Sequence, residues 1–230
     1  MKRLLLVAML IVLALVAGCA TYQKPDPSQK VLFNAKKIAL IKYQEKPPAY
    51  FVDIGSLHRP NGWLVIALTE QNVGEKSFKF TQKINANLGS PNLEKDFQEA
   101  LVRLLGERGC EVRTITVSRD KSGNPIISEI SSTEFDAIVD IAFIPGYFAY
   151  GPTTDYRRAL QGDLKVYSAA DRKLMFSKPL DLKAFTRKGQ PPEFQYKDFD
   201  ELMADPVAAF NGLKAWVTSN AVLFVANTLR

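Results

Sequence analysis

The stretch Ala137-Ile-Val-Asp-Ile-Ala-Phe-Ile144 decides the fold, because seven of its eight residues are apolar. A continuous apolar run of this length, followed by Pro145-Gly146, is typical of a strand in the centre of a sheet. We expect this proline and glycine to end or bend the strand. Lys36 to Tyr43, Tyr50 to Ile54 and Glu111 to Val117 predict further strands. The chain therefore contains a sheet built around one long apolar strand.

A hairpin follows the central strand. Leu164 to Tyr167 and Leu174 to Phe176 flank the polar stretch Ser168-Ala-Ala-Asp-Arg172, which has the length and composition of a hairpin turn. Apolar residues continue to alternate with polar ones from Leu180 to Ala184. This alternation predicts an antiparallel part of the sheet with one apolar and one polar face.

The residues from Ser90 to Gly109 predict a helix. Ser90 can cap the free N–H groups, and Pro91 suits the first helical position. One apolar stripe recurs at helical spacing, and Gly109 is a natural left-handed terminator. The stripe contains Leu93, Phe97, Ala100, Leu101, Leu104 and Leu105.

A second helix is predicted at the end of the chain. Asp205 can cap it and Pro206 can open it, and apolar residues continue to Phe224. Asn211, Lys214, Asn220 and Asn227 interrupt the apolar surface, which makes the helix too polar to span a bilayer. We expect it to pack on the sheet.

Residues 78–88 fit two patterns. Alternation of apolar and polar residues indicates a half-buried strand, whereas the four-residue spacing of Phe80, Ile84 and Leu88 indicates one face of a helix. Both alternatives stay open here, with the helix favoured. Together the elements predict a single α+β domain over residues 31–230, with a mixed sheet and packed helices.

The N-terminal residues have the pattern of a secretory signal. Lys2 and Arg3 precede an apolar stretch from Leu4 to Val16, and small residues then lead to Cys19. The run Val16-Ala17-Gly18-Cys19 resembles the lipobox of bacterial lipoproteins. That resemblance implies removal of residues 1–18 and a diacylglycerol and N-acyl lipid on Cys19.

Residues 19–30 are predicted to be a lipidated tether, because two prolines and polar neighbours disfavour a helix. Lipid chains on Cys19 would make the membrane the first partner, since each buried CH₂ contributes about 0.8 kcal/mol. Ala20, rather than Asp, follows the cysteine. In lipoproteins of the enteric type this residue implies sorting to the periplasmic face of the outer membrane.

The net charge and the cysteine and histidine content limit which classes of partner and cofactor are expected. The chain carries 30 basic and 24 acidic residues, and loss of Lys2 and Arg3 would leave 28 against 24. We expect no nucleic-acid partner for a mildly basic exported protein. Cys110 would have no partner for an internal disulfide, and we expect it to be a small buried residue. The single histidine, His58, cannot supply the usual zinc sets, so no metal or further cofactor is expected.

Two sequence features could carry chemistry. Asp140 lies within the apolar central run, where a carboxylate must be paired or have a perturbed pKa. The interpretation we favour is a pair with Arg or Lys. Ser118-Arg-Asp-Lys121 matches the Ser-x-x-Lys pattern of penicillin-interacting enzymes, which requires a helix. This segment instead follows a predicted strand.

An aromatic and basic cluster follows the central strand, and exposed aromatic and Arg side chains suit a protein-binding surface. The alternative is that these rings cover the end of the core. The predicted contact residues are Tyr147, Phe148, Tyr150, Tyr156, Arg157 and Arg158.

The order of elements resembles a known group of envelope proteins. The phrase Phe135-Asp-Ala-Ile-Val-Asp140 and the hairpin from Asp163 to Ser177 are similar to the curli-secretion lipoprotein and the N-terminal domain of TolB. Pro47-Pro48-Ala49-Tyr50 resembles a segment of uncharacterised proteobacterial lipoproteins. These resemblances imply the fold and a role in envelope assembly, and they supply no catalytic residue.

The leading functional prediction is a membrane-anchored periplasmic lipoprotein that binds or scaffolds a protein partner, or associates with itself, without catalysis. The alternative is an oligomeric export or pore subunit of the outer membrane, with residues 55–88 inserted in the bilayer. A third hypothesis is an envelope hydrolase that uses Asp140 or Ser118.

Overall fold

The computed structural model describes six stretches of the chain, and the chain divides into two compact units, residues Met1–Lys30 and Val31–Arg230. The described stretches all belong to the second unit. The predicted signal peptide, the tether with Cys19, and the residues His58 and Tyr150 lie outside them. The described residues are 35–42, 49–54, 74–121, 124–149, 154–184 and 194–229.

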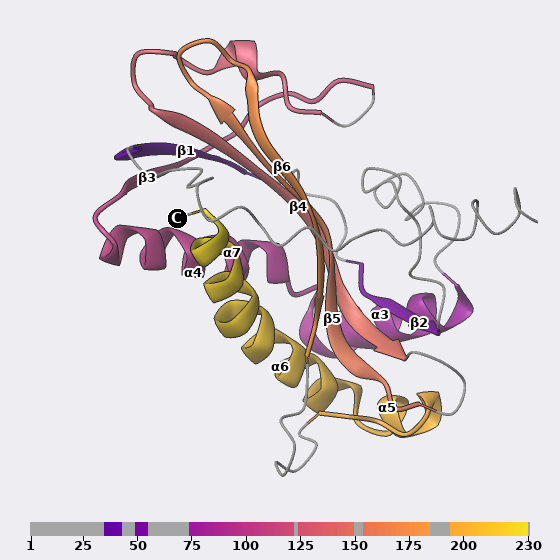
Figure 1. Ribbon diagram of the computed structural model, residues 1–230. Helices are drawn as coiled ribbons and strands as arrows, with labels where there is room; N and C mark the ends of the chain where they lie inside the picture. The colour runs from indigo at the N-terminus through magenta and orange to yellow at the C-terminus, as the bar shows by residue number, and fades with distance from the viewer. Residues whose placement is uncertain are drawn as a thin grey trace, which may run out of the picture. The chain divides into compact units, whose positions relative to one another are not determined.

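The described residues form a sheet of six strands; five follow the order β3-β1-β4-β5-β6, and the sixth, β2, also pairs with β4 (Figure 1). β4 and β5, and β5 and β6, are antiparallel, whereas β1 and β2 run parallel to β4. The predicted mixed sheet of an α+β domain is thus confirmed. The strands are β1 (Lys37–Ile41), β2 (Phe51–Ile54), β3 (Glu111–Ile115), β4 (Ala137–Ala149), β5 (Arg157–Ser168) and β6 (Leu174–Lys183).

One edge of β4 pairs with two different strands. β1 lies against its first residues, where Ile38 is opposite Ala137, and β2 lies against its last residues, where Phe51 is opposite Gly146. The strand therefore does not end at Pro145, which pairs with Leu160 of β5. On the edge of β4 away from β5, residues 140–145 lie between β1 and β2 and face no described strand. A proline, which has no N–H group, is tolerated at such an unpaired position.

Gly146 permits the close approach of β2. A Cβ atom at this position would lie 2.0 Å from the Phe51 carbonyl oxygen and 2.7 Å from its ring. Any side chain would therefore push β2 away from the last residues of β4. Absence of a side chain next to another backbone is the usual reason for glycine within a strand.

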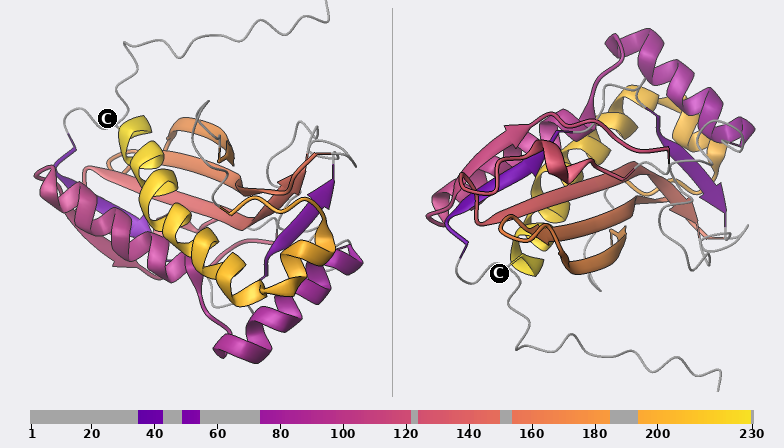
Figure 2. Two further views of the ribbon diagram at one scale, coloured as in Figure 1. Left: turned by 90° about the horizontal axis from the view of Figure 1, so that it is seen from below. Right: turned by 90° about the horizontal axis from the view of Figure 1, so that it is seen from above.

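Helices cover one face of the sheet, as Figures 1 and 2 show for α4, α6 and α7. A five-residue π-helical segment, Val217–Ala221, joins α6 to α7. The hydroxyls of Thr218 and Ser219 donate to the carbonyls of Lys214 and Ala215, and this bonding to the preceding turn accompanies the wider segment. The helices are α3 (Glu75–Leu88), α4 (Leu93–Glu107), α5 (Phe199–Ala204), α6 (Pro206–Trp216) and α7 (Val222–Thr228), with a short 3₁₀ turn at Ile127–Glu129.

One of the two helix caps predicted from the sequence agrees with the structure. The Asp205 carboxylate accepts from the Ala208 N–H with Pro206 in the first turn, which confirms the predicted cap. The cap of α4 is Asn92, whose side chain accepts from the Lys95 N–H, and the prediction of Ser90 is wrong. Ser90 has a φ of 58° and belongs to the turn between α3 and α4.

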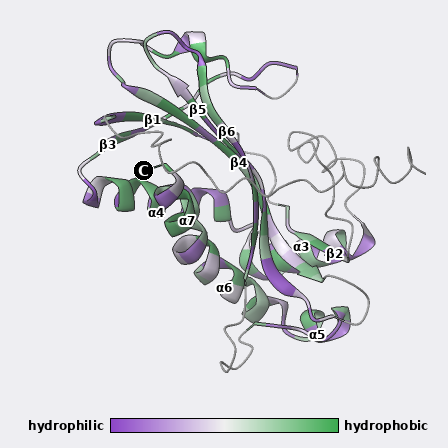
Figure 3. Cartoon of the chain, in the orientation of Figure 1, coloured by the Kyte–Doolittle hydropathy of each residue, from purple (hydrophilic) through white to green (hydrophobic). Residues whose placement is uncertain are grey.

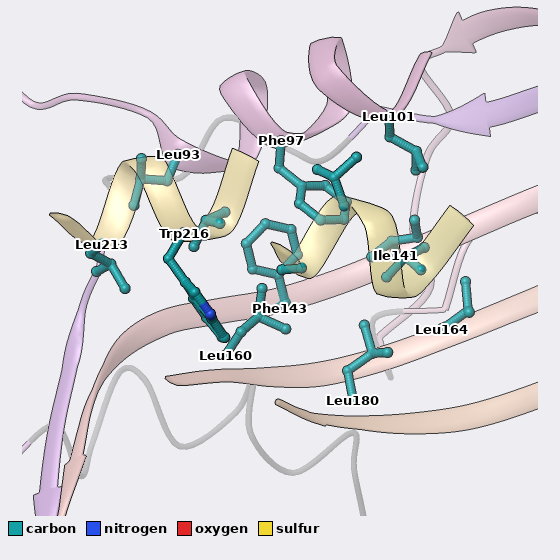
Figure 4. Close-up of a cluster of buried hydrophobic side chains, with 14 of the residues drawn as sticks. Leu93, Phe97, Leu101, Ile141, Phe143, Leu160, Leu164, Leu180, Leu213 and Trp216 are labelled. Carbon is teal, nitrogen blue, oxygen red and sulfur yellow. The ribbon is translucent and has the colours of Figure 1, made fainter. Parts of the chain in front are cut away.

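The main core lies between these helices and the sheet. Figure 4 shows Phe97 of α4 over Phe143 of β4, with ring centroids 4.8 Å apart. Alternate residues of β4 before Pro145, including Val139 and Ile141, point into this core, as do Tyr147 and Ala149 after it. β4 and α7 are coloured mainly as hydrophobic in Figure 3. We call this side of the sheet, which carries Val139, Ile141, Phe143, Tyr147, Leu160 and Leu164, the helix face.

Residues 75–88 form helix α3, which confirms the favoured alternative. Its hydroxyl groups bind the backbone of β2 and of the residue before it: Ser77 accepts from the Val52 N–H at 2.8 Å, and Thr81 accepts from the Tyr50 N–H at 3.0 Å. Phe80 and Ile84 are fully buried. The exposed hairpin that the pore alternative requires is therefore not formed by residues 75–88, and residues 55–73 lie outside the described stretches.

Within the stretches that the structure describes, no helix has both the length and the apolar composition that a membrane crossing requires.

Candidate functional site

The second face of β4, β5 and β6 is polar over much of its area. Pairing across the strands brings Asp140 opposite Lys165, Ile144 opposite Gln161, and Gln161 opposite Asp181. In the part of the chain that the structure describes, the helices of the main core lie on the other side. We call this side, which carries Asp140, Gln161, Asp163, Lys165, Ser177 and Asp181, the polar face.

The Asp140 carboxylate binds the Arg119 guanidinium on this face. Its two oxygens accept from Arg119 at 2.7 and 3.4 Å, and the Asp140 and Arg119 side chains are only 6% and 10% exposed. A two-pronged arginine–carboxylate pair fixes orientation as well as charge. The favoured interpretation of Asp140 as a paired carboxylate is therefore confirmed.

The segment that carries Arg119 is held against the sheet at a second point. Arg119 forms a β-bridge with Pro125, and the amide oxygen of Asn124 accepts from the Lys165 ammonium at 3.1 Å. Two charged side chains of the sheet, Asp140 and Lys165, thus bind opposite ends of one loop. Each contact satisfies a polar group that would be costly to leave unpaired.

Asp163 lies near this ion pair on β5. Burial raises the pKa of the Asp163 carboxyl, Lys165 partly offsets that rise, and the Asp140 carboxylate adds to it. Burial also raises the pKa of the Tyr167 hydroxyl to about 12, with a further contribution from Asp140. Two carboxyls, a lysine, an arginine and a tyrosine therefore share one partly buried region of the polar face.

This arrangement differs from the catalytic patterns considered from the sequence. Ser118 lies after β3 and outside any helix, and its N–H group donates to the Glu129 carboxylate at 2.9 Å. Lys121 lies in a turn, so the two residues do not share a helix as the penicillin-interacting pattern requires. No group of three metal-ligating side chains occurs among the described residues.

The aromatic members of the predicted contact cluster that lie in the described stretches are buried. Tyr147, Phe148 and Tyr156 are all buried, which corrects the expectation that they form an exposed patch. The Tyr147 hydroxyl donates to the Ala209 carbonyl of α6 at 2.9 Å, and its ring packs edge-on against Phe80. Burial accordingly raises the Tyr147 pKa. The physical reason is that the strand continues past Pro145 into the sheet.

The two arginines of that cluster lie on opposite faces. Arg158 is opposite Tyr147 in the sheet, and its guanidinium donates to the Gly212 carbonyl at 3.3 Å and stacks on Phe194. Arg157 is opposite Phe148 on the polar face and is half-buried. Arg157 is therefore the described member of the predicted patch that remains accessible on the polar face.

The Phe148 ring is covered by a lysine. The Lys183 ammonium lies 4.9 Å from the ring centroid and 2.9 Å from the Asp181 carboxylate. A cation held over an aromatic face in this way is weakly attractive and shields the ring from water. Phe148 thus extends the polar face toward Arg157 without exposing an apolar surface.

Asp136 is a structural carboxylate whose role the sequence did not indicate. It accepts from the N–H groups of both Lys36 and Lys37 at 2.8 Å, and these bonds lower its pKa. The bonds fix the point at which the chain enters β1. The sequence feature that could have indicated this role is the position of Asp136, directly before the central strand that begins at Ala137.

Cys110 precedes β3 and is partly buried rather than fully buried. Its sulfur lies 3.9 Å from the Ala35 carbonyl oxygen and packs at the edge of the main core. This position agrees with a small packing residue, although its burial is incomplete.

Comparisons with known proteins give no family. No family model matches the chain, and no curated protein matches it. One similar solved structure is a neuraminyllactose-binding hemagglutinin homologue from Helicobacter pylori, with 10% identity, coverage of 86% of this chain and 84% of that one, and a TM-score of 0.34. Another is a protein of family DUF330 from Xanthomonas campestris, with 12% identity, 84% and 85% coverage, and a TM-score of 0.35.

Likeness at this level has no bearing on function. The resemblance to the curli-secretion lipoprotein and the TolB domain stays a prediction.

Proposed function

We propose that this protein is a membrane-anchored lipoprotein of the bacterial envelope that acts by binding a partner, without catalysis. The observation that carries the proposal is the run Val16-Ala17-Gly18-Cys19 after a charged start and an apolar stretch. Acyl chains on Cys19 hold the protein at the periplasmic face of the outer membrane.

The described domain supports a tethered arrangement. The N–H groups of Lys36 and Lys37 donate to the Asp136 carboxylate, and these bonds hold the residues at which the chain enters the sheet. A tether that is pulled by a moving membrane anchor transmits its load to this point. The load then passes along β1, which is hydrogen-bonded on both sides, to β3 and to β4.

The contacts of the reactive groups favour binding over catalysis. Arg119 occupies both oxygens of Asp140, and Ser118 has no lysine on a shared helix. Among the described residues, Asp163 is the carboxyl whose pKa is raised, and the charged groups that act on it are Lys165 and Asp140. Such a region suits recognition of a polar surface.

The polar face provides the contact surface in this proposal. Ser177 and Asp181 on β6 are exposed, and Gln161 and Arg157 on β5 are half-buried. Both signs of charge occur along it, so a protein partner with alternating charges fits better than a uniformly charged polymer. A surface with both signs of charge contributes more to the specificity and the rate of association than to the affinity.

The intact mass of the purified protein tests the anchor. We expect the mature chain to lack residues 1–18 and to carry a diacylglyceryl group and one further acyl chain on Cys19. Cys19→Ser should abolish both the added mass and the cleavage that depends on it. A wild-type mass equal to the unmodified polypeptide would refute the anchor.

In-cell photocrosslinking tests the contact surface. Benzoylphenylalanine placed at Asp181 or Gln161 should give a discrete adduct, whereas Asn211, exposed on α6, serves as the matched control position. Arg157→Glu should reduce the adduct formed from Asp181 while leaving the folded domain intact. Equal adducts from Asp181 and Asn211, or none from Asp181, would refute the polar face as the contact surface.

A further inference from the structure

β2, β3 and β6 each have one edge that no other described strand pairs with. Helix α3 occupies this edge of β2. The Ser77 hydroxyl bonds both the N–H and the C=O of Val52. The Thr81 hydroxyl does the same for Tyr50, the residue before the strand. These bonds satisfy the backbone groups that a further strand would use.

The outer edge of β6 is poorly suited to pairing with another strand. Pro179 lies within β6 and has no N–H group, and Lys178 and Lys183 lie in the same strand. The register between β5 and β6 also shifts between Val166 and Tyr167. Prolines, lysines and bulges are the usual features that prevent pairing at an exposed edge.

The outer edge of β3 has none of these features. The strand, Glu111-Val-Arg-Thr-Ile115, contains neither proline nor lysine, and its pairing with β1 is regular along its whole length. Val112, Thr114 and Ile115 are β-branched, which favours an extended backbone. β3 is the first strand in the order of the sheet, and Figure 1 draws it at one end of the sheet, beside α4. This edge is therefore open to a further strand in a way that the edges of β2 and β6 are not.

The hydrogen bonds of β3 show which backbone groups face outward. The Glu111 N–H donates to the Lys36 carbonyl, and the Ile115 carbonyl accepts from the Lys42 N–H, each at 2.7 Å. Successive residues of a strand bond to alternate sides. Since Glu111 and Ile115 bond toward β1, the N–H and C=O groups of Val112 and Thr114 face the outer edge. No strand pairs with that edge in the part of the chain that the structure describes.

The charged side chains of β3 are complementary to those of a second β3. Glu111 and Arg113 are exposed on one side of the sheet, with their charged groups 2.7 Å apart. When two copies of β3 pair antiparallel with Val112 opposite its own copy, each Glu111 lies opposite the other copy's Arg113. These are non-hydrogen-bonded positions, where the Cα atoms are about 4.5 Å apart and side chains come closest. Opposite charges at such positions attract, and like charges destabilise the pairing.

This register is the favourable one for two identical edges. Two copies that hydrogen-bond about a twofold axis perpendicular to the sheet run antiparallel, and the same residues contact from both sides. A pairing centred on Arg113 would place two arginines opposite each other. A pairing centred on Thr114 would place Arg113 opposite Ile115, with no ion pair. The pairing centred on Val112 forms two ion pairs and uses the outward backbone groups of Val112.

We infer that a second copy of this chain pairs with the outer edge of β3, antiparallel and with Val112 opposite its own copy, so that Glu111 and Arg113 form two ion pairs between the copies. The two sheets then join into one continuous sheet. Because the twofold axis is perpendicular to that sheet, both polar faces lie on the same side, and the dimer presents the polar face twice. The inference depends neither on the lipid on Cys19 nor on the partner of the polar face.

Disulfide trapping tests the register on the full-length protein, purified in mild detergent. Val112→Cys in a Cys110→Ala background places two thiols across the twofold axis, where Cα atoms about 5.5 Å apart fit a disulfide. Thr114→Cys in the same background is the matched control, because its two copies would be about 14 Å apart. Thr114 is exposed and Val112 is half-buried, so reactivity alone would favour the control. We expect several-fold more disulfide-linked dimer at position 112, and Cys110→Ala alone measures any contribution of Cys19.

Charge variants test the ion pairs. Native mass spectrometry should show a dimer for the wild type and mainly monomer for Glu111→Arg or Arg113→Glu alone, since each single change places like charges opposite each other. A mixture of the two single variants should form a mixed dimer, because every opposing pair is then opposite in charge. The double variant Glu111→Arg with Arg113→Glu should dimerise as the wild type does. Circular dichroism verifies that each variant is folded.

Three results would overturn the inference: a monomeric wild type, single charge variants that dimerise as well as the wild type, or equal disulfide yields at positions 112 and 114. None of these results bears on the proposed function, which the mass of the mature chain and the adducts from Asp181 test separately.

Discussion

The two faces of β4 and β5 obtain their stability in different ways, although their residues alternate along the same strands. On the helix face, Val139, Ile141 and Phe143 share one continuous apolar core with residues of α4 and α6. On the polar face, the described residue that binds the Asp140 carboxylate is Arg119, which is twenty-one residues away in the sequence.

This difference determines what a substitution does on each face. Removing atoms from the helix face leaves a cavity whose cost is spread over many neighbours. Removing one member of the ion pair on the polar face leaves a buried charge without the partner that binds it. We therefore expect the polar face to be sensitive to a change in one member of the Asp140–Arg119 pair and to tolerate the joint replacement of both.

The largest expected effect is at the centre of the helix face. Phe97→Ala should lower the free energy of unfolding by about 3–5 kcal/mol, because Phe97 is fully buried and packs on Phe143. Urea unfolding followed by circular dichroism measures the change. The exposed Phe78 is the matched control, and Phe78→Ala should change stability by no more than about 0.5 kcal/mol. Equal losses for the two variants would show that the helix face is not the core.

A slightly smaller effect is expected on the polar face. Arg119→Met should cost about 3 kcal/mol, because Asp140 would remain buried without its partner. The double variant Arg119→Met with Asp140→Leu should recover much of that loss, since no buried charge remains. The same urea titration measures both. A double variant no more stable than Arg119→Met would mean that the ion pair is not what the single change disrupts.

The smallest effect concerns pH and Asp163. Burial raises the Asp163 pKa in the folded protein, so the folded state favours the protonated carboxyl. Its contribution is full below the pKa of the unfolded chain and is lost as the pH rises through the folded-state pKa. Asp163→Asn stays neutral, so its stability relative to wild type should increase between about pH 4 and pH 7.

Urea titrations of the two proteins at both pH values measure this change. If the difference in unfolding free energy between Asp163→Asn and wild type were the same at both pH values, burial would not raise the pKa of Asp163.

Local patterns predicted most of the helix face. The apolar run from Ala137 gave the central strand, the stripe through Phe97 and Leu101 gave α4, and Asp205-Pro206 gave the start of α6. These features depend on residues within a few positions of one another. For the same reason the hairpin β5–β6 was predictable from its polar turn.

The polar face and the ends of the sheet were less predictable, because they depend on distant pairing. Only the fold brings Arg119 to Asp140, or places β2 beside the last residues of β4. That second pairing extends the sheet beyond Pro145 and buries Tyr147, which the sequence alone left open between a contact surface and the core. Ser90 was a plausible cap by composition, but its positive φ belongs to a turn and the cap lies at Asn92.

The proposed function depends on attachment of the domain to a membrane through lipid on the sulfur of Cys19. The most direct measurement compares wild type with Cys19→Ser by fractionation of cell envelopes. The account predicts that wild-type protein sediments with outer membranes and resists extraction by high salt and carbonate, whereas the variant loses this attachment. A Cys19→Ser protein that remains as firmly bound to the outer membrane as wild type would contradict the account.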